Sequence, residues 1–223
     1  MASLVKADIR KAADPLHAEQ LRNARANIFL GVRVPIQRKI AKKHRNIPLK
    51  DIIDLLRSEI HENRQTSLFI LTHQFVKADQ RRRKEIVELY LNNTKYINNW
   101  DLVDTSAYKI LGTWLLDKPR DLLYRLAKSD NLWERRISII STFAFIDKGE
   151  LSDAVALAKI LLHDEYAPIH KATGWALRVV GKKDFETLVT FLDEHFMEMP
   201  RIMLRYATEK LSEEQRQHYL SSK

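Results

Sequence analysis

Apolar residues recur at spacings of three and four along nearly the whole chain, and few residues interrupt this pattern. Leu49 to Ile60 contains one such stripe, and Ser67 to Val76 continues it with Leu68, Ile70 and Phe75. Only five glycines and six prolines occur in 223 residues, so helices joined by short turns are favoured and strands have little support. The sequence predicts an all-α protein in which these two segments form an antiparallel helix pair.

A weak internal repeat runs through the same segments. Arg64-Gln65-Thr66-Ser67-Leu68 resembles Arg135-Arg136-Ile137-Ser138-Ile139 at an offset of 71 residues, and Arg136 to Ser138 lies 34 residues before His170-Lys171-Ala172. A period of about 35 residues, doubled once, is typical of stacked helical pairs, with a plain helical bundle as the alternative. Chain breakers mark the expected turns at Pro48, Pro119, Gly149 and Gly181. No linker divides the chain, which predicts one domain over residues 1–223.

Composition excludes several kinds of chemistry. Without cysteine the chain has no disulfide, thiolate nucleophile or thiolate metal ligand, and its eight histidines show no metal-ligand spacing. No metal or other cofactor is therefore expected. The first ten residues carry Lys6, Asp8 and Arg10, and no window has the length of a membrane span. We expect a cytoplasmic protein, most simply a monomer.

The net charge of +9 is concentrated in one block. Between Gln20 and Lys50 there is no acid, and the basic residues are Arg22, Arg25, Arg33, Arg38, Lys39, Lys42, Lys43, Arg45 and Lys50. The remaining 29 basic residues balance the 29 acidic ones. Such a block is favoured as a binding surface for a polyanion, and a solvated helix face or a solubility patch is the alternative.

Two groups of side chains suggest a site on the inner helices of the stack. Trp100 and Asp104 lie four residues apart, which places an indole and a carboxylate on one helix face. Lys171, Trp175 and Arg178 follow i, i+4, i+7 spacing, and a stripe of cations with an indole suits phosphate and sugar better than a core. The helix that begins at Asn131 adds Trp133, Arg135 and Arg136.

Each of these residues also has a structural interpretation. On spacing alone, Asp104 is equally a surface acid paired with Lys109 or Arg135. Trp133 and Trp114, which are flanked by leucines, are expected to anchor the core. The residues by themselves therefore leave these alternatives open.

Five segments, taken together and in order, resemble those of the AlkD-type DNA alkylation repair family. They are Phe29-Leu30-Gly31-Val32-Arg33-Val34-Pro35, Asn99 to Asp104, Ser129 to Arg136, His170 to Arg178 and Pro200 to Ala207. The resemblance implies a right-handed α-solenoid of HEAT-like repeats. It also implies a DNA glycosylase that excises positively charged N3- and N7-alkylated purines from double-stranded DNA, without flipping the base and without a cofactor.

The resemblance assigns roles to individual residues. Trp100, Trp175 and Asp104 correspond to the residues that surround the damaged nucleotide, and Arg136 corresponds to a phosphate-binding arginine. Arg135, Lys171 and Arg178 would support Arg136 in holding phosphates. Arg38, Lys39, Lys42 and Lys43 would bind the duplex at a greater distance.

Two positions depart from the family's pattern. Asn99 stands where some active relatives have a second tryptophan, and Asn23 to Ile28 replaces a longer aromatic, glycine-rich stretch. Two rival functions stay open. One is a non-enzymatic scaffold for branched or bent DNA, which has no need of the Asp104 carboxylate; the other is a protein-binding helical-repeat module, which the basic block disfavours unless its partner is acidic.

Overall fold

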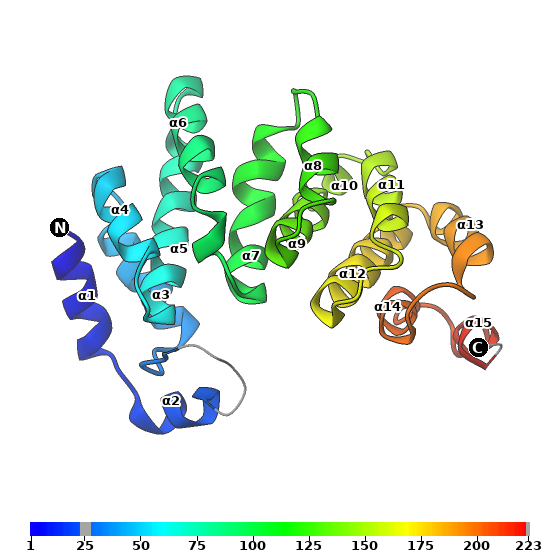
Figure 1. Ribbon diagram of the computed structural model, residues 1–223, viewed down its shortest axis with the longest axis horizontal. Coiled ribbons are helices and arrows are strands. Elements are labelled where there is room, and N and C mark those ends of the chain that lie inside the picture. The colour runs from blue at the N-terminus through cyan, green and yellow to red at the C-terminus, as the bar shows by residue number, and fades with distance from the viewer. Residues whose placement is uncertain (23–27, 222–223) are drawn as a thin grey trace. The chain divides into compact units, whose positions relative to one another are not determined.

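The computed structural model describes residues 1–22 and 28–221, and every regular element in those residues is a helix (Figure 1). Contacts between residues divide the chain into two compact units, Met1–Ser106 and Ala107–Lys223, which we call unit 1 and unit 2. None of the helices in the described ranges is both long and apolar enough to cross a membrane.

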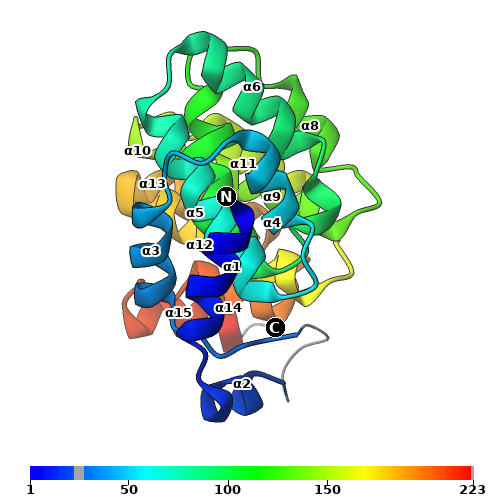
Figure 2. The same cartoon turned by 90° about the vertical axis from the view of Figure 1, so that its left-hand side faces the viewer.

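Unit 1 is built around one buried helix. Its helices are α1 (Ala2–Lys11), α2 (Pro15–Arg22), α3 (Val34–Lys43), α4 (Leu49–Leu56), α5 (His61–Lys77), α6 (Gln80–Leu91) and α7 (Trp100–Ala107), whose last residue falls in unit 2. Residues 61–71 of α5 are all buried, and α1, α3, α4 and α6 contact this helix. Figure 2 faces this unit, with α1 in front, α3 to its left and α4 to its right.

Unit 2 is organised around a second long helix. It contains a π-helical turn (Tyr108–Gly112) and α8 (Asp121–Leu126), α9 (Leu132–Ser141), α10 (Phe143–Asp147), α11 (Ser152–Ile160), α12 (Ala167–Lys183), α13 (Phe185–His195), α14 (Arg201–Ala207) and α15 (Glu213–Ser221). The helix α12 contacts α9, α11, α13 and α14. A Cβ on Gly174 would lie 2.4 Å from the Met203 carbonyl oxygen, so only glycine allows α12 and α14 to approach this closely.

The internal repeat is visible in matching hydrogen bonds. Arg64 Nη1 donates to the carbonyls six and five residues before it, at 2.8 and 3.0 Å. Arg135 Nη1 does the same at 2.7 and 3.2 Å. The Ser67 and Ser138 hydroxyls each donate to the carbonyl of the arginine three residues earlier, at 2.6 and 2.7 Å. We call residues 58–67 the first turn and residues 129–138 the second turn.

These observations confirm the predicted all-α fold of repeated helical pairs, with local corrections. The predicted helix 49–60 ends at Leu56, and α5 begins at His61 instead of Ser67. Gly181 does not mark a turn, because it lies inside α12. Its missing Cβ makes room for the Leu188 side chain, whose Cδ2 would be 2.3 Å away. The single domain predicted from the sequence stays a prediction.

Candidate functional site

Trp100 is the first residue of α7 and is unusually exposed for an indole. Trp100 is 46% exposed, whereas Leu102 and Val103 on the same helix are fully buried. The Asn99 side-chain oxygen accepts the backbone N–H of Trp100, the first residue of α7, at 2.8 Å, and so satisfies one of the free N–H groups at the start of the helix. Asn99 therefore has a structural task at the position where some relatives carry a second tryptophan.

Asp104 lies one turn after Trp100 and is partly buried. On the buried side of α7, the Tyr90 hydroxyl shares a 3.0 Å hydrogen bond with the Ser106 hydroxyl. Burial raises the pKa of Tyr90, and the charge of Asp104 adds to this effect. The Asp104 carboxylate thus lies near the buried side of α7 as well as one turn from the exposed indole of Trp100.

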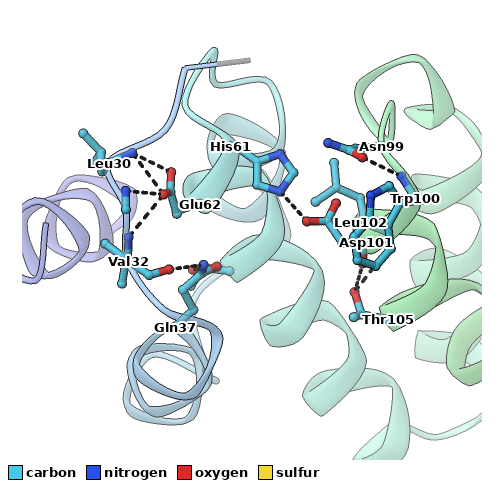
Figure 3. A network of polar contacts seen from close by, with 12 residues as sticks. Leu30, Val32, Gln37, His61, Glu62, Asn99, Trp100, Asp101, Leu102 and Thr105 are labelled. Carbon is cyan, nitrogen blue, oxygen red and sulfur yellow. Dashed lines mark hydrogen bonds and ion pairs between the residues drawn. The ribbon is translucent and has the colours of Figure 1, made fainter. Parts of the chain in front are cut away.

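The first turn holds α7 through an imidazole and a carboxylate. His61 Nε2 lies 2.9 Å from Asp101 Oδ2, and the side chains are 2% and 17% exposed (Figure 3). His61 Nδ1 is buried and makes no hydrogen bond to the described residues. A neutral ring with its proton on Nε2 avoids burying a second N–H without an acceptor. Asp101 directly follows Trp100, so this bond restrains the turn that carries the indole.

The segment Phe29 to Pro35 is anchored by a carboxylate of the next helix pair. Glu62 Oε1 accepts the backbone N–H groups of Leu30, Gly31 and Val32 at 3.0, 2.7 and 3.3 Å (Figure 3). Gly31 has a φ of +81°, and a Cβ there would lie 2.0 Å from the Asp14 carbonyl oxygen, so no other residue fits. The Phe29 ring packs 4.7 Å from the His61 ring, centroid to centroid.

Arg64 places a cation among these acids. Its residue is 5% exposed. Burial lowers the pKa of its guanidinium, while the charges of Asp101 and Glu62 act in the opposite direction. Sequence analysis missed His61, Glu62, Arg64 and Asp101 as a group, because their contacts cross 30 to 40 residues and follow no local spacing.

The predicted phosphate-binding arginines of unit 2 are already engaged with protein. Arg136 is 5% exposed, and its Nη1 donates to the Pro168 carbonyl at the start of α12. Arg135 Nε lies 2.6 Å from Asp164 Oδ2, and its guanidinium lies 5.4 Å from the centre of the Tyr166 ring. A phosphate would therefore share these guanidinium groups with the protein's own acceptors.

The predicted stripe on α12 also contains residues that are engaged with protein and one that is exposed. Trp175 is partly buried, and its ring meets Phe143 edge to face at 4.7 Å. Arg178 forms an ion pair with Glu209, whereas Lys171 is exposed. Trp133, the second residue of α9, is also only partly buried, and its expected role as a core anchor stays a prediction.

Trp114, the other tryptophan expected in the core, is likewise partly buried. The Lys118 ammonium lies 4.0 Å from the centre of its ring. The lysine covers the face that the protein interior leaves open, as long cationic side chains often do on aromatic rings.

The acid-free block divides into engaged and exposed cations. The Arg38 guanidinium stacks 4.3 Å from the centre of the Phe69 ring, and Lys43 Nζ lies 2.7 Å from Asp8 Oδ2. Lys39 and Lys42 are exposed on α3. Arg25 and the other residues of 23–27, including the departure from the family's pattern noted above, lie outside the described residues.

Trp100, Asp104, the first turn and the described part of the acid-free block all belong to unit 1. The remaining predicted residues belong to unit 2. They are Arg135, Arg136, Lys171, Trp175 and Arg178.

Comparisons with known proteins agree with one another. Residues 5–211 match the family described as DNA alkylation repair enzyme. A solved structure described as a predicted DNA alkylation repair enzyme from Enterococcus faecalis has a similar fold, with a TM-score of 0.70 and 16% sequence identity. The similarity covers 90% of this chain and 97% of that one. No curated protein matches the sequence.

Proposed function

Because the chain belongs to the family of DNA alkylation repair enzymes, we propose that it is a DNA glycosylase for positively charged N3- and N7-alkylated purines in duplex DNA. The observation that carries this proposal is the exposed Trp100 with Asp104 one turn later, on a helix whose opposite face is buried. Phosphate binding alone needs neither an exposed indole nor a carboxylate, which would repel the DNA backbone.

The proposed reaction breaks the bond between C1′ of the deoxyribose and the purine nitrogen. The alkylated base already carries a positive charge, so it leaves as a neutral molecule with the bonding electrons and needs no general acid. Positive charge then develops on the sugar, where the face of the Trp100 indole and the Asp104 carboxylate would stabilise it. Water adds to C1′ and gives up a proton, for which Asp104 is the acceptor. The products are the free base and an abasic site.

The residues of unit 2 enter the proposal as contacts to the same DNA. We assign phosphate binding to Arg136 and to Lys171, whose side chain is exposed, with Arg135 and Arg178 in support. Trp175 would pack against deoxyribose with the part of its ring that Phe143 leaves uncovered. Such contacts position the duplex without reading its sequence. The protein is proposed to act as a monomer in the cytoplasm.

Base release from defined duplexes tests the proposal. We expect release of N7-methylguanine and N3-methyladenine, and none of hypoxanthine or uracil, because neutral bases need a general acid and a base pocket. Efficient release of a neutral base would overturn the mechanism. Binding of duplex without any release would instead identify a non-enzymatic DNA scaffold.

A substitution in α7 tests the role of the carboxylate. Asp104→Asn keeps the shape and removes the charge, so single-turnover release should fall at least about tenfold, which is about 1.4 kcal/mol of barrier. DNA affinity should hold or improve. The matched control is Asp121→Asn, which removes an exposed carboxylate from the first turn of α8 and should leave release unchanged. Equal rates in the two variants would remove Asp104 from the mechanism.

A further inference from the structure

Unit 1 contains a basic pocket far from α7 along α5. The pocket has a volume of about 220 Å³ and is lined by Arg45 from the segment after α3, His73 and Lys77 from α5, and Arg82 from α6. None of the described residues that line it is acidic. Arg45, His73 and Lys77 are exposed, so their charged or polar ends face solvent at the pocket.

The backbone around this pocket is held in place. Gln74 Nε2 donates to the Arg45 and Ile47 carbonyls, at 2.9 and 2.8 Å. This amide ties the segment that carries Arg45 to α5, the helix that carries Lys77. The backbone positions from which Arg45 and Lys77 extend are therefore fixed relative to each other before any ligand arrives.

The surrounding charges select the ligand. Arg82 has an ion pair with Glu85 at 2.8 Å, but both side chains are about 40% exposed, and such surface pairs are weak enough to yield to a stronger anion. Arg45 belongs to the acid-free block, and Lys42, one turn before it, is exposed. A small anion that forms part of a larger polyanion fits this arrangement, because the block continues the positive surface beyond the pocket.

Resting on the DNA binding proposed above, we propose that this pocket binds one backbone phosphate of the duplex. His73 and Lys77 lie 12 and 16 residues after His61 on α5, which corresponds to about 18 to 24 Å along a helix. His61 marks the end of α5 that contacts the turn of Trp100. For a duplex that runs along α5, at about 3.4 Å per base pair, the bound phosphate is five to seven base pairs from the nucleotide that Trp100 faces.

Two exposed side chains provide the test. The double variant Arg45→Gln/Lys77→Gln should lose one phosphate contact, which reduces the salt slope of binding by about 0.9. Between 50 and 200 mM salt, the wild-type affinity should therefore fall about 3.5-fold more than that of the variant. The control is Lys128→Gln/Lys148→Gln, which removes the same charge from exposed positions of unit 2. An equal change in both would mean a general charge effect and would overturn the site.

A scan with neutral methylphosphonate linkages locates the phosphate. Neutralising one linkage five to seven base pairs from the lesion should weaken wild-type binding and leave the double variant unaffected. If neutralising a linkage weakened binding of the double variant as much as binding of the wild type at every position, the pocket would be refuted. If the double variant did not fold, Lys77→Gln alone would serve, since it changes only one exposed side chain of α5.

Base release is measured separately, at saturating protein. The pocket variant should release the base as fast as the wild type once DNA is bound, because the pocket is far from α7. Absence of release in both proteins, with the linkage effect intact, would refute the glycosylase and leave the phosphate site standing.

Discussion

The first and second turns share their anchoring and differ in what they hold. Both fix an arginine to two backbone carbonyls and a serine to the arginine carbonyl. The first turn then buries His61 and Glu62, which reach Asp101 and the backbone of residues 30–32. At the same positions, the second turn has Leu132 and Trp133, which are both partly buried.

The arginines of the two turns also find their opposite charges differently. Arg64 shares a buried region with Glu62 and Asp101, whereas Arg135 pairs directly with Asp164, from the segment before α12. What the turns have in common therefore serves the repeated scaffold. The buried contacts of His61 and Glu62 occur only in the first turn. The His61 contact connects that turn to the start of α7, so we expect a functional difference between the two repeats there.

Loss of the Glu62 charge should be the most damaging change. In Glu62→Gln the amide oxygen can still accept the N–H groups of residues 30–32, but an NH2 group replaces Oε2, which faces the Leu30 N–H at 3.0 Å. Arg64 also has one anion fewer, so we expect a loss of about 3 kcal/mol in the free energy of unfolding. Denaturation with urea measures it. Glu134→Gln is the comparison in the second turn. The Glu134 carboxylate accepts the Ser129 hydroxyl at 2.6 Å, and its loss of charge should cost about 1 kcal/mol. Similar losses would show that the turns do not differ in this respect.

The hydrogen bonds that the two turns share predict equal effects for substitutions of Arg64 and Arg135. In Arg64→Lys and Arg135→Lys, the compact ammonium cannot reproduce the geometry of a guanidinium held by two carbonyls. We expect each variant to lose about 2 kcal/mol in the free energy of unfolding. If only one variant is destabilised, the matching hydrogen bonds do not have a common role in the two repeats.

The imidazole–carboxylate contact of the first turn should affect chemistry more than stability. Asp101→Ala removes the contact that restrains the N-terminal residues of α7. It should lower single-turnover base release about threefold, equal to about 0.7 kcal/mol of barrier, with DNA affinity unchanged. The control is Asp8→Ala, which removes another aspartate–histidine contact, 2.7 Å from His44 Nε2. A fall in release in both variants would indicate a general loss of stability instead of positioning by Asp101.

The repeat was predictable from sequence because its signal is local. Arg64 and Arg135 stand 71 residues apart in similar surroundings, and each forms its defining bonds within six residues of itself. Helix ends were less predictable. Gly181 looks like a chain breaker in the sequence, but it lies inside α12, where its missing Cβ makes room for Leu188 of the next helix. Sequence spacing does not show such packing.

The candidate site was predictable only in part. Trp100 and Asp104 share one helix, so their spacing places them on one face. The contacts that hold that helix come from His61, 40 residues earlier. The engagement of Arg136 with the Pro168 carbonyl depends on packing between α9 and α12, which charge patterns do not reveal. Sequence patterns identified candidate residues, whereas burial and partners required the structure.

A pH-dependent effect distinguishes Asp153 of unit 2 from Glu62, because Asp153 accepts hydrogen bonds from side chains and Glu62 accepts them from backbone amides. The Tyr124 hydroxyl donates to Asp153 Oδ1 at 2.7 Å. Burial, with a further contribution from Asp153, raises the pKa of Tyr124 from 10.0 to about 12. The folded protein therefore keeps this proton where the unfolded chain loses it. The stability gained is complete below pH 10 and disappears as the pH rises from 10 to about 12.

Tyr124→Phe tests this difference. The variant should be less stable than the wild type by about 1 kcal/mol at neutral pH, because a hydrogen bond to a carboxylate is lost. That gap should stay constant up to pH 10 and narrow as the pH approaches 12. Free energies of unfolding in urea, measured for both proteins from pH 7 to 12, give the profile. A gap that remained constant through pH 12 would mean that the Tyr124 hydroxyl is not held protonated by its surroundings, and that the acids of unit 2 leave tyrosine ionisation unaffected.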